Sequence, residues 1–445
     1  MRNFRGWNIS VRKWIFLLLL GLAVPGRAWA QDPVAPVFPD DPRLEDYLAW
    51  ADDHHPAVAG EMGREAALRH TAREAGALPD LKFGWGEMIV PVETRVGPQQ
   101  RIFSLSQNLP WFGTLGLKES VATVRADAAS HRIQGRRLAV RHEVRDAWLQ
   151  LAYLQGEIDI VSRNLDLARQ IEAAARSTYQ AGTGSFADVL SAQIEVDELE
   201  SGLAGLRDRI RPETVRLNLA AGLASQHPTP TIFRDLLDSA DCDLPSAEVL
   251  WSMLERNNPQ LAALALEKES RSQAVELAGK AAYPGLTLGV DYIMTGPAPM
   301  EGVPDSGKDP VIARLGVSIP LWGGKASAEK KASAGWLASA SADLTDARRQ
   351  LNSRLESALF AWREARRHID LYGTTLVDSG RQALDVTSAR YRSGQASYVD
   401  LVTARKTLLG LELAHLRAEI EQEQALNDLA TLVGTTSEEW AHHDR

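Results

Sequence analysis

Cysteine is nearly absent from this chain, which has one, Cys242, among 445 residues. A single thiol excludes an intrachain disulfide and any metal site built on several thiolates. Basic residues are also in deficit, because the formal net charge is −9 at pH 7, so we expect no nucleic-acid partner. Phosphate-binding loops, nucleophile constellations and catalytic pairs of acids are missing too. We therefore predict no enzymatic activity, no cofactor and no resident metal.

Long apolar runs are missing after the N-terminal region, where no stretch of about 18 apolar residues could form a transmembrane helix. The N-terminus has four basic residues within its first 13, an apolar run at 14–24, and Ala-Trp-Ala at 28–30. This order predicts a signal peptide over residues 1–30, cleaved near Ala30. An exported chain without a transmembrane helix is expected to be either soluble or a β-barrel.

Proline is absent from two long parts of the chain, Trp111 to Arg211 and Leu321 to the C-terminus. Because a helix interior excludes proline, we predict that both parts are helical. Each is interrupted by a glycine-containing turn, at Ala181 to Ser185 and at Ser393 to Ser397. Each part therefore forms a long antiparallel hairpin, and its first helix runs, in the first case, from Leu117 to about Gln180. Apolar residues recur there three and four positions apart, as in a one-sided packing stripe: Val140, Val144, Trp148, Leu151, Leu154, Ile158, Val161, Leu165, Ala168 and Ile171.

The chain repeats one plan twice, at a separation of 203 to 212 residues. Five matched segments occur in the same order in both halves: 55–59 with 258–262, 78–81 with 283–286, 106–113 with 317–323, 179–190 with 391–402, and 221–222 with 433–434. We infer a duplicated unit. The predicted divisions after the signal peptide are a first repeat at 31–222, a linker at 223–257, a second repeat at 258–434 and a C-terminal tail at 435–445.

Between the helical parts, apolar residues alternate with small or polar ones, which predicts strands with one apolar face. Two such segments occur in each repeat, at 81–86, 103–106, 286–293 and 311–319. We expect strands of roughly nine to eleven residues, the length that crosses a bilayer when tilted, joined by loops at Pro91 to Gln100 and Thr295 to Pro310. Four strands cannot close a barrel, which needs about eight or more. This predicts oligomerisation; the alternatives are a small soluble sheet packed on the helices and a periplasmic coiled coil.

Three motifs stand at matching places of the plan: Leu-Pro-x-Leu at 78–81, Ser-Gln-Asn-Leu-Pro-Trp-Phe-Gly at 106–113, and Tyr-x-x-Gly followed by Asp at both hairpin turns. In this order, from about Arg43 to Gly434, they resemble TolC-like outer-membrane factors. The resemblance implies a mixed α and β fold with an internal two-fold repeat. Long antiparallel helical hairpins would form an α-barrel tunnel, and four transmembrane strands per protomer would enter a trimeric β-barrel of about twelve strands.

The resemblance also implies a homotrimer in outer-membrane lipid, with a periplasmic tunnel, that works with a periplasmic adaptor (membrane fusion) protein and an inner-membrane pump. Such a channel is a passive, gated exit duct for small molecules or metal cations. The alternatives are an exit duct for type I protein secretion and, in a different class, a soluble periplasmic coiled-coil adaptor or scaffold. The acidic chain and a likeness of Pro-Trp-Phe-Gly at 110–113 to metal-efflux relatives slightly favour a metal cation over drugs, solvents and polypeptides.

Two acidic residues follow the hairpin turns at equivalent places, Asp188 and Asp400. The resemblance implies that they line a closed periplasmic entrance, together with Thr403, where relatives carry a second acid. Carboxylates from three copies would form a ring that attracts cations. Both acids also end a Ser-x-x-Asp sequence, which is close to a capping box at a helix start. Capping and gating are equally supported at this point.

The turns themselves are candidate contacts for the adaptor, as the resemblance implies. Glycine at each turn lets the chain reverse, with a positive φ expected. Tyr179 and Tyr391, each three residues before a turn glycine, are expected to pack or hydrogen-bond between neighbouring hairpins, and core packing is favoured. The candidate adaptor contacts are Ala181, Gly182, Thr183, Ser393, Gly394 and Gln395.

Overall fold

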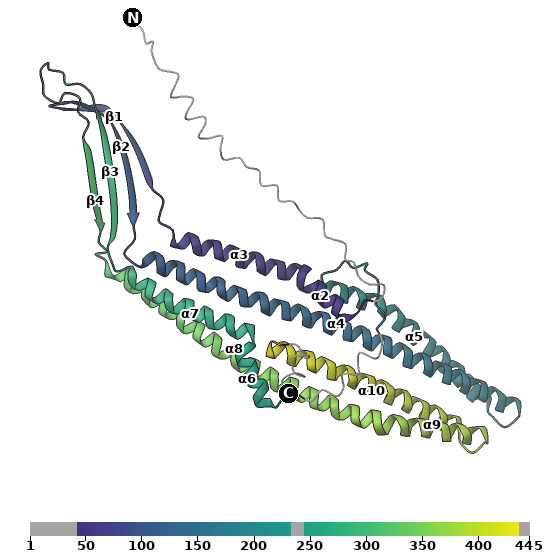
Figure 1. The fold of residues 1–445 in the computed structure, drawn as a ribbon. Coiled ribbons are helices and arrows are strands. Elements are labelled where there is room, and N and C mark those ends of the chain that lie inside the picture. Colours follow the sequence, from purple (N-terminus) through teal and green to yellow (C-terminus); the bar gives the residue numbers. More distant parts are fainter. Residues whose placement is uncertain (1–41, 233–243, 436–445) are drawn as a thin grey trace, which may run out of the picture. The chain divides into compact units, whose positions relative to one another are not determined.

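The computed structural model describes residues 42–232 and 244–435, which belong to one compact unit, Asp40–Arg445. The predicted signal peptide, Cys242 and the predicted tail beyond Thr435 lie outside the described residues. Within this unit, two series of elements follow each other in the same order: two helices, two strands and a long helical hairpin (Figure 1). The predicted duplication is therefore confirmed.

The two series can be aligned element by element. The first comprises α2 (Leu44–His54), α3 (Pro56–Gly76), β1 (Lys82–Thr94), β2 (Gly97–Leu109), α4 (Thr114–Gln180) and α5 (Phe186–Ala220). The second comprises α6 (Ala247–Asn257), α7 (Pro259–Lys280), β3 (Gly285–Thr295), β4 (Val311–Ser318), α8 (Gly323–Leu371), the π-helical turn η2 (Tyr372–Leu376), α9 (Val377–Arg392) and α10 (Tyr398–Val433). Helix α6 lies within the predicted linker and takes the place in the second series that α2 takes in the first.

Both series begin their second helix at a proline, whose fixed φ suits the first helical turn. Before Pro56, the imidazole Nδ1 of His55 accepts a hydrogen bond from the backbone N–H of Ala57 at 3.1 Å. Before Pro259, Oδ1 of Asn258 accepts hydrogen bonds from two backbone N–H groups in the first turn of α7, at 2.9 and 3.1 Å. The matched His-Pro and Asn-Pro pairs are therefore helix starts.

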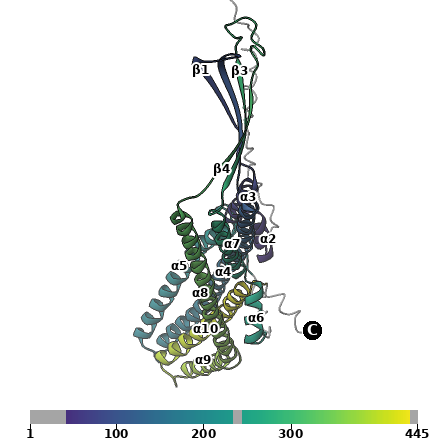
Figure 2. The ribbon, with the colours of Figure 1, turned by 90° about the vertical axis from the view of Figure 1, so that its left-hand side faces the viewer.

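The longest helix, α4, has 67 residues and packs against α3, α5, α7 and α10 (Figures 1 and 2). The predicted apolar stripe faces these neighbours, and Val144, Trp148 and Leu151 are at most 2% exposed. Each such burial stabilises the fold by about 1.5–3 kcal/mol, so packing rather than helix propensity holds a helix of this length. None of the described helices is both long and apolar enough to cross a membrane.

Helix α5 continues through Pro212 to Ala220, so the prediction that this helical part ends at Arg211 is wrong. Pro212 is exposed, and water can therefore bond to the backbone carbonyl that loses its helical partner. Thr214 and Leu217, beyond the proline, are 4% and 0% exposed. Packing of this last part outweighs the local cost of the proline.

The predicted loop at Pro91 to Gln100 is also wrong, because β1 runs to Thr94 and β2 begins at Gly97. Strand β1 has 13 residues, which is longer than predicted. Pro91 lies where the register between β1 and β2 is interrupted, on an edge strand. A proline is tolerated there because no ladder hydrogen bond needs its missing N–H.

The four strands form one antiparallel sheet in the order β1-β2-β3-β4, so β1 and β4 are its edges (Figure 1). The predicted alternation is confirmed, since one face carries apolar side chains that none of the described elements covers. Phe83, Trp85, Leu288 and Leu315 of this face are between 49% and 69% exposed. Large apolar side chains so exposed mark a surface that meets lipid or another protein.

A π-helical turn, η2, separates α8 from α9 in the second hairpin. Gly373, in this turn, faces His415 of α10. A Cβ atom at residue 373 would lie 2.8 Å from Cε1 of the imidazole. Glycine therefore permits the close approach of α10 at this place.

Candidate functional site

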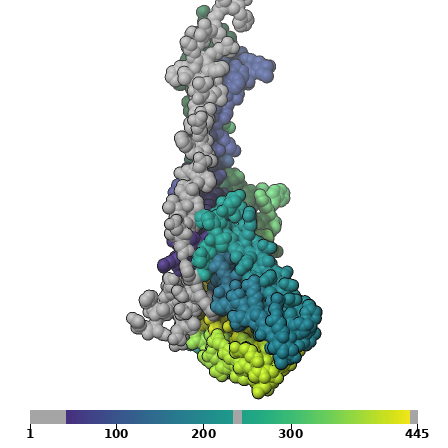
Figure 3. Space-filling model, turned by 90° about the vertical axis from the view of Figure 1, so that its right-hand side faces the viewer, coloured from purple at the N-terminus to yellow at the C-terminus, as the bar shows by residue number. Residues whose placement is uncertain are grey.

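The ends of the two hairpins lie next to each other (Figure 3), and they share one apolar core. Helices α4 and α5 of the first hairpin and α9 and α10 of the second all contribute to it. The buried members are Ile171, Ala175, Val189, Ala192, Leu384, Tyr391, Tyr398, Leu401 and Leu408. This core sets how the two turns stand relative to each other within one protomer.

The first turn joins Gln180, the end of α4, to the start of α5. Gly182 has a φ of +73°, a left-handed conformation that glycine adopts without steric cost. Ser185 then caps α5, because its hydroxyl accepts a hydrogen bond from the N–H of Ala187 at 3.1 Å. The proposed adaptor contacts here, Ala181, Gly182 and Thr183, are all exposed.

The second turn has the same backbone plan but a stronger cap. Gly394 has a φ of +74°. The N–H of Asp400 donates to Oγ of Ser397 at 3.2 Å, and the N–H of Ser397 donates to Oδ2 of Asp400 at 3.0 Å. This reciprocal pair is a capping box. The proposed adaptor contacts Ser393, Gly394 and Gln395 are exposed.

The three proposed gate residues lie in the first two turns of α5 and α10. Asp188 is half-buried, whereas Asp400 and Thr403 are exposed. The hydroxyl and backbone N–H of Ser397 lower the pKa of Asp400, so this carboxylate is charged at neutral pH. Asp400 and Thr403 line the same shallow hollow of about 270 Å³ between α9 and α10, and Thr403 donates its hydroxyl to the carbonyl of Val399 at 2.7 Å.

The two tyrosines at equivalent places have different surroundings. Tyr391 is 7% exposed and packs in the core that the hairpins share. Tyr179 is 46% exposed, and its ring lies 5.4 Å from that of Phe186 in the same hairpin. Sequence reasoning missed Tyr398, which is 7% exposed, and burial raises its pKa to about 12. Equivalent positions in a duplicated sequence therefore do not imply equivalent contacts.

Sequence reasoning also missed a buried arginine in the second hairpin. Arg405 of α10 is 1% exposed, and its guanidinium donates to Oδ1 of Asn164 on α4 and to a carboxylate oxygen of Glu195 on α5. A buried charge needs such partners, so this cluster joins α10 to both helices of the first hairpin. A signal was present, because Arg405 interrupts the apolar stripe between Leu401 and Leu408, at helical spacing.

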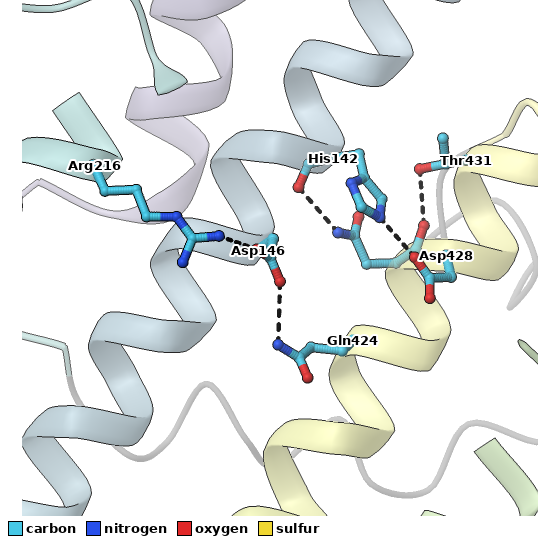
Figure 4. Close-up of polar contacts among 7 residues, drawn as sticks. His142, Asp146, Arg216, Gln424, Asp428 and Thr431 are labelled. Atoms are coloured by element: carbon cyan, nitrogen blue, oxygen red, sulfur yellow. Dashed lines mark hydrogen bonds and ion pairs between the residues drawn. The ribbon is translucent and has the colours of Figure 1, made fainter. Parts of the chain in front are cut away.

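A second polar layer joins α4 to α5 and α10 (Figure 4). The imidazole Nε2 of His142 lies 2.7 Å from Oδ1 of Asp428, and this hydrogen bond raises the pKa of His142. One turn further along α4, Asp146 accepts hydrogen bonds from Arg216 of α5 at 2.8 Å and from Gln424 of α10 at 3.1 Å. Polar contacts therefore join the hairpins at several levels, which include this layer and the Arg405 cluster.

Paired long hairpins and a four-stranded sheet with an exposed apolar face fit the class that the sequence predicts, the subunit of an outer-membrane channel. Comparison with known families agrees with this class: the model for "outer membrane efflux protein" matches residues 95–223 and 250–435. Because the match covers most of the chain, the protein belongs to the outer membrane efflux protein family.

Individual relatives have low sequence identity to this chain but match most of its length. The chain is similar to nodulation protein T of Rhizobium leguminosarum bv. trifolii, with 21% identity over 415 residues, 89% of this chain and 86% of the relative. Among solved structures, the outer membrane protein VceC of Vibrio cholerae superposes with a TM-score of 0.73 and 18% identity, covering 88% of this chain and 96% of VceC. The MtrE outer membrane channel of Neisseria gonorrhoeae, in its open state, gives a TM-score of 0.71 and 16% identity, covering 89% of each chain.

The family and the shared fold make this chain a subunit of an outer-membrane efflux channel, as the sequence predicts. A soluble periplasmic scaffold and a type I secretion duct are not favoured. The predicted mixed fold, with long helical hairpins, four strands and an internal repeat, is confirmed.

Proposed function

We propose that three copies of this chain form a passive, gated exit duct that works with a periplasmic adaptor and an inner-membrane pump. The observation that carries the proposal is the sheet, which has one exposed apolar face and two edges that no described strand pairs. In lipid every strand edge must be paired, and identical copies can pair β4 of one with β1 of the next in a closed ring. Three copies supply about twelve strands. We further propose that export removes residues 1–30.

The oligomer is tested on protein extracted from outer membranes with detergent. We expect the mass of a trimer by light scattering and stepwise conductance in planar bilayers. A monomer that forms no pores would contradict the proposal.

The lipid-facing surface is tested with two neighbouring arginine variants. Leu288→Arg places a charge on the apolar face, where arginine costs about 2–4 kcal/mol at the bilayer midplane, and it should reduce insertion into the outer membrane. Thr287→Arg, on the opposite face of β3, is the matched control and should insert normally. Equal insertion of the two variants would mean that the apolar face does not meet lipid.

The gate is proposed at Asp188, Asp400 and Thr403. Two carboxylates from each of three copies would attract cations at the entrance, as acidic rings do in channels. Replacing Asp188 and Asp400 together by Ala should lower cation selectivity, measured from reversal potentials in salt gradients. Asp400→Asn keeps an acceptor for the helix cap and separates loss of charge from loss of capping.

The matched control for the gate removes two exposed aspartates away from the turns. Asp159 lies on α4 and Asp378 on α9, with side chains that are each 63% exposed. Replacing both by Ala should leave the selectivity closer to that of the native channel than the gate variants do. Reversal potentials that do not change in the gate variants would refute the gating role.

Adaptor contact is proposed at the exposed turn residues. Thr183→Arg combined with Gln395→Arg should lower export in cells and leave the conductance of the purified channel unchanged. Ser201→Arg, at an exposed site on α5, is the control and should export normally. A loss of conductance in the turn variants would point to folding instead of adaptor contact.

A further inference from the structure

The face of the sheet opposite the apolar one carries a row of in-register residues with a basic side chain at each end. Lys82 of β1 pairs with Ser106, Ser106 with Gly289, and Gly289 with Arg314 of β4. A Cβ atom at Gly289 would lie 3.5 Å from Cβ of Ser106 and 3.8 Å from Cβ of Arg314, so these positions share one face. The small residues between them leave the two basic side chains uncovered.

The next row on this face contains one acid. Asp291 pairs with Ser104 and with Ile312 in register, and its carboxylate binds the guanidinium of Arg314. The side chain of Asp291 is 4% exposed, whereas that of Arg314 is 58% exposed. Within these two rows, two positive charges against one negative charge leave one net positive charge per copy, and both basic residues are exposed.

The opposite, apolar face has no excess of positive charge in the same part of the sheet. In the stretch of continuous pairing from Lys82 to Glu87, its charged residues are Glu87 and Arg101, which pair with each other at 2.8 Å. Its other rows are aromatic and aliphatic: the ring of Phe103 lies 6.5 Å from Phe83 and 6.3 Å from Tyr292. In strands that alternate between lipid and lumen, the apolar face meets lipid and the polar face meets water. The unbalanced charge therefore lies on the water side.

We propose that Lys82 and Arg314 form a basic band in the lumen of the barrel, which attracts anions and makes this section select against free cations. The inference rests on the proposed trimer. Lys82 is on one edge strand and Arg314 on the other, so closure brings basic residues of neighbouring copies to the same boundary. Rings of charged side chains select ions by the sign of their charge. A gate of carboxylates and a basic band would act in series on charged solutes.

The experiment measures reversal potentials of reconstituted channels in a dilute KCl gradient, near 10 mM, where the Debye length is about 30 Å. Channels that carry Asp188→Ala and Asp400→Ala are the starting point, so that the proposed gate does not dominate. Adding Lys82→Gln and Arg314→Gln changes the net charge of the band in each copy from positive to negative. We expect the reversal potential to shift toward the equilibrium potential of K⁺. Lys82→Gln alone should give a smaller shift in the same direction, which keeps the test valid if Arg314→Gln disturbs the pairing of Asp291.

Arg101→Gln is the matched control, because it removes one positive charge from the opposite face of the same sheet. It should leave the reversal potential unchanged. Conducting channels whose reversal potential is the same in Lys82→Gln, in the double variant and in Arg101→Gln would overturn the band while leaving the proposed channel intact. Native protein that never conducts would overturn the proposed channel, and the band with it.

Discussion

The two helical hairpins follow one sequence plan, yet only the first has an unbroken outgoing helix. Helix α4 runs for 67 residues, whereas the matching arm consists of α8, the π-helical turn and α9. At the 212-residue separation that relates Tyr179 to Tyr391, Gly373 of the π turn corresponds to Val161, which is 8% exposed in the packing stripe of α4. A valine there packs and keeps the helix regular; a glycine allows a π turn, which is often found at functional sites.

The polar contacts between the hairpins show the same divergence. At the same separation, Arg405 corresponds to Gln193, and Asp428 corresponds to Arg216. Arg216 and Asp428 both bind α4, one turn apart, but with opposite charge. The duplicated plan therefore gives two similar hairpins, but the charged residues that join them do not occupy equivalent positions in the two copies.

The largest expected effect comes from removing Arg405, whose equivalent in the first hairpin is the uncharged Gln193. Arg405→Ala leaves Glu195 and Asn164 without their partner, and removing one member of a buried ion pair costs about 3–5 kcal/mol. We expect the lower end of this range, because the ammonium of Lys406 stays 3.1 Å from the carboxylate of Glu195. The measurement is the free energy of unfolding of the native and variant proteins in denaturant.

Arg417→Ala is the matched control for Arg405, since it removes an exposed arginine from the same helix, and this arginine contacts α4 through a long hydrogen bond of 3.5 Å to the hydroxyl of Tyr153. It should change the free energy of unfolding by about 1 kcal/mol or less. If the two variants were equally stable, the Arg405 cluster would not join the hairpins.

The next effect distinguishes the π turn from a regular helix, because replacing glycine by alanine should change the stability in opposite directions at the two places. Gly373→Ala pushes a Cβ atom against the imidazole of His415, and overpacking of this kind costs about 1–3 kcal/mol. In α5 of the first hairpin, a Cβ atom at Gly202 would meet nothing within 4 Å. Gly202→Ala should therefore stabilise the protein by up to about 1 kcal/mol. Thermal unfolding of both variants measures the difference, and a stabilising Gly373→Ala would show that the turn is not tightly packed.

How much of the fold and of the candidate site could be predicted from the sequence depends on whether each feature is set by neighbouring residues or by distant ones. Proline placement and helical spacing located the helical parts, and glycine located both turns. Helix α4 ends at Gln180 as predicted and begins three residues before the predicted Leu117. The same rule failed at Pro212, because packing beyond it outweighs a local cost. The partners of Arg405 are 241 and 210 residues away in the chain. No local pattern identifies such contacts, although a charge inside an apolar stripe shows that some partner must exist.

A smaller effect compares the caps of the two turns. Ser397→Ala removes one member of a capping box, whereas Ser185→Ala removes a single accepted hydrogen bond. Loss of a serine N-cap costs about 1 kcal/mol, and we expect the larger loss at Ser397. Amide hydrogen exchange in the first turns of α10 and α5 measures each cap locally. Equal acceleration in both variants would mean that the second hydrogen bond of the Ser397 hydroxyl, which it donates to Oδ2 of Asp400 at 2.8 Å, adds nothing to the second turn.

The smallest effect is a dependence of stability on pH. The contact between His142 and Asp428 should show it, and the contact between Asp146 and Arg216 should not. The hydrogen bond to Asp428 raises the pKa of His142, so the protonated imidazole stabilises the fold. That contribution is complete below the unfolded pKa of about 6.5 and is lost as the pH rises through the higher folded pKa. The side chains of His142 and Asp428 are 32% and 53% exposed, so solvent screening keeps the contribution below about 1 kcal/mol.

His142→Gln tests this dependence, with Arg216→Gln as the comparison. The stability lost in His142→Gln should be greatest below pH 6.5 and should vanish at a pH well above the folded pKa. Arg216 stays charged throughout this range, so the loss in Arg216→Gln should not vary with pH. If the loss in His142→Gln were equally constant, the imidazole would join α4 to α10 as a neutral hydrogen-bonding group, and both contacts on α4 would be insensitive to pH.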